Sequence, residues 1–101
     1  MITCCIRYKV DRKRLAEFEE YGRLWIGLIG RFGGTHHGYF LPAEGRSDEA
    51  LALFSFASLS EYERYRKEAA SDPEAQEAVR YGEERGLLLD WDRTFYRPVL
   101  S

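Results

Sequence analysis

Hydrophobic and polar residues follow two different periods along this chain, and the change of period predicts its first two elements. Residues 2–10 alternate between apolar and polar side chains, which is typical of a half-buried β-strand. After Asp11, a suitable N-cap, apolar residues from Leu15 to Ile29 recur every three or four positions. This spacing predicts an amphipathic helix of about five turns, which ends at the glycines that follow it.

The rest of the chain carries three more strand patterns and two more helix patterns. Ser58 and Ser60 each have a glutamate three residues later, which is the capping-box spacing. Asp72-Pro73 combines an N-cap with a proline in the first helical turn, and Gly86 is a typical helix stop. The predicted elements are, in order, a strand over 35–41, a strand over 50–56, a helix from Ser58 or Ser60, a helix over 72–86 and a strand over 87–98.

The order β-α-β-β-α-(α)-β is the split βαβ pattern of ferredoxin-like domains. It predicts an α+β fold in which a four-stranded antiparallel sheet has its helices on one face. Residues 50–56 are apolar at consecutive positions, so both faces of this strand need a cover. An exposed apolar patch of this kind is rare in monomers, and we therefore expect a two-fold homodimer that packs sheet to sheet. The side chains concerned are Leu51, Leu53, Phe54 and Phe56.

Length and composition narrow the class of protein. A chain of 101 residues, 45% hydrophobic and 15% aromatic, suffices for a single domain over residues 1–101 and is too short for two cores. Its 15 basic and 17 acidic residues give a net charge of −2, which argues against a nucleic-acid partner. No apolar run approaches the roughly 20 residues that a membrane span requires.

The cysteines and the N-terminus indicate the compartment. Cys4 and Cys5 are adjacent, point to opposite faces of the predicted strand and have no other cysteine to bond. A reducing compartment follows, and the N-terminus has none of the regions of a secretory signal peptide. We expect a cytoplasmic protein.

The segment 32–45 combines the residues most suited to a functional site. It places His36, His37 and Tyr39 on a strand between a Gly-Gly turn and a proline, with Glu44 in the loop that follows. Structural strands carry mainly Val, Ile and Thr, so two imidazoles here favour a ligand pocket with both histidines as candidate catalytic residues. Tyr39 and Glu44 are then candidate substrate contacts. Each histidine taken alone is more typical of a packed ring that is hydrogen-bonded to a neighbouring strand or to Glu44.

A metal centre is not expected from the two histidines. Consecutive strand residues point to opposite faces, so one ion is not easily chelated by both. With no thiolate or carboxylate at ligand spacing, we expect no mononuclear metal site and no cofactor. A metal shared across a dimer interface is left open.

Arg7 is a candidate substrate-binding residue on the first strand. An arginine buried in the middle of a sheet needs a partner. One partner is a substrate carboxylate or enolate, held in bidentate geometry. The alternative is a salt bridge to a carboxylate of the chain, for which the candidates are Glu44, Asp90 and Asp92.

Trp25 is the candidate binding residue on the first helix. With Phe18 and Tyr21 it forms a stripe that is more typical of a core than of a binding wall. Its position toward the Gly-Gly turn nevertheless suits a substrate contact. Cys5 fits a small buried hydrophobic residue better than a nucleophile.

Several motifs occur together along the chain. They are Ile6-Arg7-Tyr8; Phe18, Tyr21 and Trp25; Phe32 to Pro42 with its Gly-Gly-Thr-His-His-Gly run; Glu44-Gly45; Ala50 to Phe56; Asp72-Pro73; and Arg93 to Pro98. In this combination the chain resembles the NIPSNAP family of the dimeric α/β-barrel superfamily over essentially its whole length. The resemblance implies the ferredoxin-like fold and the dimeric α/β barrel. Relatives in the superfamily include cofactor-independent monooxygenases and small-molecule-degrading enzymes, so it also implies a pocket, without a specific reaction.

Two hypotheses for function follow. In the first, the protein binds or transforms a small aromatic or acidic metabolite without a bound cofactor, with a histidine as general base and Arg7 holding the developing anion. An enzyme of this kind would be monooxygenase-like or would degrade a small molecule. In the second, the protein is a non-catalytic interaction or ligand-sensing homodimer in which the histidines are structural.

Overall fold

The computed structural model describes residues 1–100 and has the predicted order of elements. Within these residues the chain forms four strands, three α-helices and a short 3-10 helix, η1. Their bounds are β1 Ile2–Val10, η1 Arg12–Arg14, α1 Leu15–Arg31, β2 Thr35–Phe40, β3 Glu49–Phe56, α2 Leu59–Ser71, α3 Pro73–Arg85 and β4 Leu88–Tyr96. No helix in residues 1–100 is long and apolar enough to cross a membrane.

Short polar side chains cap the N-termini of η1, α2 and α3. Asp11 accepts a hydrogen bond from the Lys13 N–H at 2.9 Å and thereby caps η1, which then leads into α1. Of the two serines considered for α2, Ser58 is the cap, and its hydroxyl accepts from the Glu61 N–H at 3.1 Å. Asp72 caps α3 through the Ala75 N–H at 2.9 Å. At the other end of α3, Gly86 adopts the left-handed conformation (φ 61°) that favours glycine.

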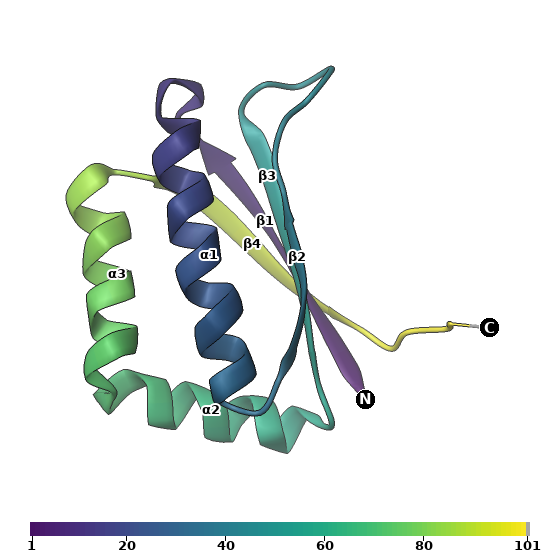
Figure 1. The fold of residues 1–101 in the computed structure, drawn as a ribbon. Helices are drawn as coiled ribbons and strands as arrows, with labels where there is room; N and C mark the ends of the chain where they lie inside the picture. Colours follow the sequence, from purple (N-terminus) through teal and green to yellow (C-terminus); the bar gives the residue numbers. More distant parts are fainter. Residues whose placement is uncertain (101) are drawn as a thin grey trace.

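The strands form one antiparallel sheet in the order β2-β3-β1-β4. Figure 1 shows the three helices together on one side of this sheet, with no element of the described chain over the other side. This is the expected α+β ferredoxin-like arrangement. We call the two sides of the sheet the helix-facing side and the open face.

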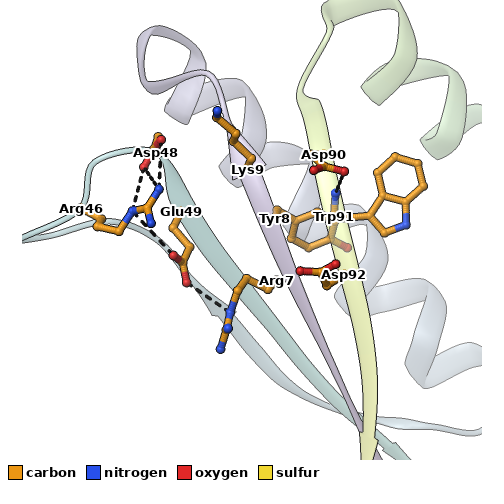
Figure 2. A pocket seen from close by; sticks show the side chains of 9 residues that line it. All are labelled: Arg7, Tyr8, Lys9, Arg46, Asp48, Glu49, Asp90, Trp91 and Asp92. Carbon is orange, nitrogen blue, oxygen red and sulfur yellow. Dashed lines mark hydrogen bonds and ion pairs between the residues drawn. The ribbon is translucent and has the colours of Figure 1, made fainter.

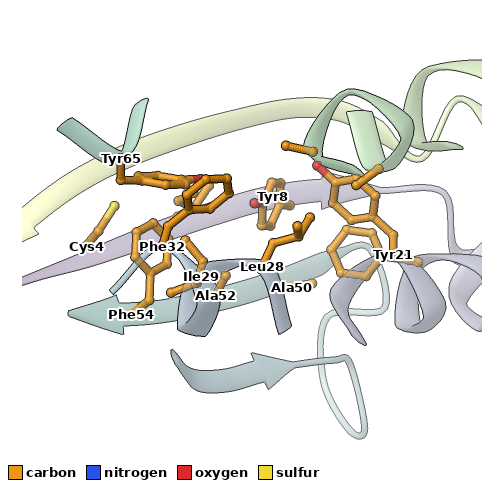
Figure 3. Packing of buried hydrophobic residues seen from close by; sticks show 14 of the residues in the cluster. Cys4, Tyr8, Tyr21, Leu28, Ile29, Phe32, Ala50, Ala52, Phe54 and Tyr65 are labelled. Atoms are coloured by element: carbon orange, nitrogen blue, oxygen red, sulfur yellow. The ribbon is translucent and has the colours of Figure 1, made fainter. Parts of the chain in front are cut away.

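The helix-facing side carries the hydrophobic core (Figure 3). Because strand residues alternate between faces, this side receives Cys4, Ile6, Tyr8 and Val10 from β1 and Ala50, Ala52, Phe54 and Phe56 from β3. Helix α1 covers them with Phe18, Tyr21, Leu28 and Ile29. All of these side chains are buried.

The open face receives only part of the apolar residues expected there. Phe54 and Phe56 are 5% and 3% exposed and belong to the core, so placing them in an exposed patch was wrong. Leu51 and Leu53 alternate with the core residues of β3 and are half-buried on the open face. Strand β3 is therefore apolar on both faces, but its side chains are buried on the helix-facing side, whereas Leu51 and Leu53 are only half-buried on the open face.

Strand β2 contains a β-bulge at the two histidines. His36 pairs with Phe54 and Gly38 pairs with Leu53, which leaves His37 as an extra residue. Gly38 has a φ of 120°, a conformation that side chains rarely adopt, and this explains the glycine in the middle of a strand.

Strand β4 is an edge strand that the helices leave largely uncovered. Its residues from Leu89 to Tyr96 are all exposed. On the helix-facing side this includes Trp91, at 52% exposed, and Phe95, at 39%. The incomplete cover leaves room between β4 and α3, and one cavity opens there.

Candidate functional site

A small cavity of about 100 Å³ lies between the sheet and α1, and we call it the inner cavity. It brings together three of the residues selected from the sequence: His36 and Tyr39 on β2, and Trp25 on α1. The other residues that line it are Ile6, Tyr8, Tyr21, Ile29, Phe54 and Arg93. Aromatic rings thus form most of its wall.

His36 is held in this wall as a neutral ring. Its imidazole stacks on Tyr39, with ring centroids 4.9 Å apart, and its Nδ1 accepts a hydrogen bond from the Gly38 N–H at 2.9 Å. Burial, and then the nearby His37, lower the pKa of His36 to about 4. At neutral pH the ring is therefore uncharged, and since Nδ1 is an acceptor, Nε2 carries the proton.

Two buried N–H donors are left without a partner at the inner cavity. Nε2 of His36 and Nε1 of Trp25 are buried and have no hydrogen-bond partner of standard geometry within residues 1–100; the Tyr21 hydroxyl lies close enough to the Trp25 donor to interact with it. Buried polar atoms of this kind are uncommon because leaving a donor unpaired costs free energy. Both residues line the same cavity, so one bound group with acceptor oxygens could satisfy both donors.

The tyrosine hydroxyls beside these donors stay protonated. Burial raises the pKa of Tyr21 to about 12. It raises the pKa of Tyr8 and Tyr39 further. The cavity therefore offers neutral donors from its rings and one cation, the guanidinium of Arg93.

A larger cavity of about 550 Å³ adjoins the inner one, and we call it the outer cavity. It opens between β4 and α3. The two cavities share Ile6, Tyr8, Tyr21 and Arg93, while Arg66, Val79, Gly82, Glu83, Gly86, Leu88 and Trp91 line the outer one alone. Arg93 therefore stands at the junction between them.

His37 lies on the open face, away from both cavities. Its Nε2 is 2.7 Å from the hydroxyl oxygen of Ser55, which in turn is 2.7 Å from the hydroxyl oxygen of Thr3. The two histidines thus point to opposite sides of the sheet, as consecutive strand residues are expected to do.

Arg7 also lies on the open face and is not buried. Its side chain is 59% exposed, and its Nε is 3.3 Å from a carboxylate oxygen of Glu49 (Figure 2). The expectation of a buried arginine was wrong, and so was the choice of carboxylate partner. The reason is the register of β3 against β1, which places Glu49 on the same face two positions from the residue opposite Arg7.

The surroundings of Arg7 form a shallow charged depression rather than an enclosed pocket. Figure 2 shows Lys9 beside Arg7 on β1 and Asp90 and Asp92 on β4. Glu44 is exposed in the loop between β2 and β3 and lines neither of the two cavities. The sequence candidates are therefore divided between the helix-facing side and the open face.

Arg93 is the charged residue of the inner cavity, and the sequence candidates omitted it. It alternates with Trp91 and Phe95 along β4, and this period of two places it on the helix-facing side of the sheet. The pattern could have revealed it, because an arginine between two aromatic residues on the core side of a strand calls for a partner.

A metal centre finds no support in the geometry of the described chain. Within residues 1–100 no three side chains of the types His, Cys, Asp and Glu are grouped so that they could hold an ion. Cys4 is a buried free thiol whose pKa burial raises to about 11, and Cys5 is free and half-buried on the open face.

Comparisons with known proteins agree on the fold. A family model described as NIPSNAP matches residues 4–101. No curated protein sequence matches the chain significantly.

Solved structures similar to this chain share its fold at low sequence identity. A protein from Agrobacterium tumefaciens is 18% identical with a TM-score of 0.85, and the match covers 98% of this chain and 94% of that one. An uncharacterised NIPSNAP-like domain protein from Burkholderia xenovorans is 24% identical with a TM-score of 0.80, covering 97% and 84%. SnoaB, a cofactor-independent oxygenase from Streptomyces nogalater, is 14% identical with a TM-score of 0.68, covering 99% and 94%.

Proposed function

This chain belongs to the NIPSNAP family, and we propose that it binds or transforms a small aromatic or acidic metabolite at the inner cavity. The observation that carries the proposal is the pair of buried donors, His36 Nε2 and Trp25 Nε1, which lack partners of standard geometry within residues 1–100 and line one cavity. A carbonyl, enol or carboxylate oxygen is the group that would satisfy them. The aromatic wall of Tyr8, Tyr21 and Tyr39 suits a planar ligand.

The role that we assign to His36 is hydrogen-bond donor rather than general base. A base must offer a lone pair, but Nδ1 is occupied by the Gly38 N–H and Nε2 carries the proton. A neutral imidazole can instead polarise a carbonyl and stabilise the negative charge that develops on its oxygen. This role requires no cofactor.

The protein that carries out this function is, we propose, a homodimer formed through the open face. Leu51 and Leu53 lie there, and the same face carries Phe40 and Tyr96, which are 49% and 54% exposed. Covering four such side chains with a second copy removes a patch that a monomer rarely leaves in water. We also propose a cytoplasmic location, for which the free thiols of Cys4 and Cys5 are the support.

Calorimetric titration with a panel of aromatic acids, hydroxy-aromatics and ketones tests the proposal. The variant His36→Asn keeps an acceptor for the Gly38 N–H and removes the donor at Nε2, whereas His36→Gln keeps a donor near the position of Nε2. We expect His36→Asn to weaken a ligand about tenfold and His36→Gln to weaken it less. His37→Asn, on the open face, is the matched control and should bind like the wild type.

The same titrations separate the two hypotheses for function. Mass spectrometry of the incubated ligand reports whether the ligand is chemically changed. A ligand that binds the wild type, stays unchanged and loses affinity in His36→Asn would support the ligand-sensing alternative. Binding that is equal in both His36 variants would contradict the proposed site.

A further inference from the structure

Among the residues that the structure describes, two arginines at the outer cavity have no carboxylate partner. Most arginines of this chain form ion pairs, for example Arg64 with Glu61 and Glu68 on α2. Within residues 1–100 no carboxylate lies within ion-pair distance of Arg66 or Arg93. Both line the outer cavity.

The two guanidinium groups approach the same part of the core from different elements. Arg66 comes from α2, where its Nη1 donates to the Tyr62 hydroxyl at 2.9 Å and its guanidinium lies 5.9 Å from the centre of that ring. Arg93 comes from β4. Both lie close enough to Cys4 to favour its thiolate, yet burial dominates and the thiol stays protonated. Two positive charges therefore line one cavity, and neither forms an ion pair within residues 1–100.

The remaining wall of the outer cavity is largely apolar and aromatic. Trp91, Tyr21, Val79 and Leu88 contribute it, and Glu83 is the carboxylate among the residues that line it. Glu83 forms no ion pair with either arginine in the part of the chain described. Its charge lies close enough to Tyr21 to help raise the pKa of that hydroxyl. The volume of about 550 Å³ falls within the range of about 300–1,000 Å³ that is usual for small-molecule sites.

We propose that the outer cavity binds the acidic group and apolar body of an organic anion, with Arg66 and Arg93 as the residues that hold the acid. The inference rests on the proposed function and names its ligand class. Because Arg93 stands between the cavities, the ligand is an aromatic or amphipathic acid with a second oxygen function. That oxygen reaches the donors of His36 and Trp25 in the inner cavity.

A pair of dyes tests the charge requirement directly. Anilinonaphthalene sulfonate is an aromatic anion, and phenylnaphthylamine has nearly the same body without the charge; both fluoresce more strongly in apolar surroundings. We expect the sulfonate to bind the wild type, and both Arg66→Met and Arg93→Met to weaken it about tenfold or more. The neutral dye should bind all three proteins with similar affinity.

Arg64→Met is the matched control, since Arg64 lies on the same helix and is already paired with Glu61 and Glu68. It should leave the affinity for the sulfonate unchanged. Equal affinity for the sulfonate in the wild type and in both cavity variants would overturn the proposal, as would equal losses for the neutral dye. If the sulfonate bound at the open face instead, its affinity would be equal in the wild type and in both cavity variants.

A measurement on the wild type alone covers the case in which a variant fails to fold. Phenylpropionate should displace the sulfonate dye at concentrations about tenfold or more below those that phenylpropanol requires, and equal displacement would overturn the proposal. His36→Asn separates this inference from the proposed function. Loss of dye binding in the arginine variants without any effect of His36→Asn on the metabolite panel would retain the anion site and reject the inner cavity.

Discussion

The backbone N–H of Gly38 donates a hydrogen bond to Nδ1 of His36 at 2.9 Å, and this contact decides whether the histidine can act as a donor or as an acceptor. It occupies the one lone pair of the neutral ring and leaves the proton on the buried Nε2. The β-bulge at His37 makes this hydrogen bond possible, because it turns the Gly38 amide toward the ring of His36. Residues two positions apart thereby define a donor that faces the inner cavity.

The depressed pKa of His36 predicts a pH dependence of stability. Folding lowers this pKa from 6.5 to about 4, so as the pH falls the unfolded chain takes up the proton first. The contribution of the neutral His36 ring to the free energy of unfolding is therefore fully present above pH 6.5 and is lost as the pH falls toward 4. Because the ring is partly exposed, we expect a loss of roughly 1–2 kcal/mol rather than the full value of the shift.

Urea unfolding of the wild type and of His36→Phe between pH 7 and pH 4 measures this loss. The phenyl ring keeps the stacking on Tyr39 and cannot be protonated, so the difference in unfolding free energy between the two proteins should shift in favour of the variant as the pH falls. His37→Asn removes the smaller of the two causes of the shift and should therefore keep most of this loss. A difference that stays constant over this range would contradict the buried neutral ring.

The hydrogen bond between His37 and Ser55 predicts an energetic coupling on the open face. Ser55 is 4% exposed and joins His37 to Thr3 through its hydroxyl. A double-mutant cycle of His37→Ala and Ser55→Ala should give a coupling of about 0.5–1.5 kcal/mol in the free energy of unfolding. Cys5→Ala, on the same face, should not couple to His37→Ala, and coupling of equal size there would show that the effect is not the hydrogen bond.

Gly34 predicts a steric effect at the turn between α1 and β2. A Cβ at this position would lie 2.7 Å from Cζ of Phe56 and 2.8 Å from Cγ2 of Ile29, both buried. We expect Gly34→Ala to destabilise the protein by about 1–3 kcal/mol, because the core side chains must shift. Denaturant unfolding measures the change.

Gly27, which lies within helix α1, offers the opposite case and serves as the control. Nothing lies within 4 Å of a Cβ added there, and the residue is exposed. Gly27→Ala should therefore stabilise the protein by about 0.5–1 kcal/mol through the helix propensity of alanine. If the free energy of unfolding changed in the same direction in both variants, the close approach at Gly34 would not explain the effect of Gly34→Ala.

The elements could be predicted from the sequence because their signals are local. The alternation in residues 2–10, the caps at Ser58 and Asp72 and the stop at Gly86 all act within a few residues of their own position. The opposite orientation of His36 and His37 follows from the same local geometry. Bounds differ from the prediction by one or two residues, as at β4, which begins at Leu88.

The site could be predicted only in part because its contacts depend on strand register. Arg7 finds Glu49 since β3 pairs with β1 in one particular register, and no local signal gives that register. Arg93 reaches the cavity because β4 is an edge strand that the helices leave uncovered. The bulge at His37 had a signal, the strand glycine at 38, but a glycine alone does not say which neighbour is displaced.

The proposed dimer predicts that a charge at Leu53 separates the two copies. Leu53 is half-buried on the open face, opposite Cys5 of β1 and Gly38 of β2, near the middle of the sheet. A lysine there would have to bury its ammonium group against the partner's sheet, which is costly without a counter-charge. We expect Leu53→Lys to be a monomer, while the wild type is a dimer by light scattering at micromolar concentration. Leu59→Lys is the control, since Leu59 is 48% exposed at the start of α2 and away from the open face, and it should remain dimeric. A stable wild-type monomer, or a Leu53→Lys variant that stays dimeric, would refute assembly through this face.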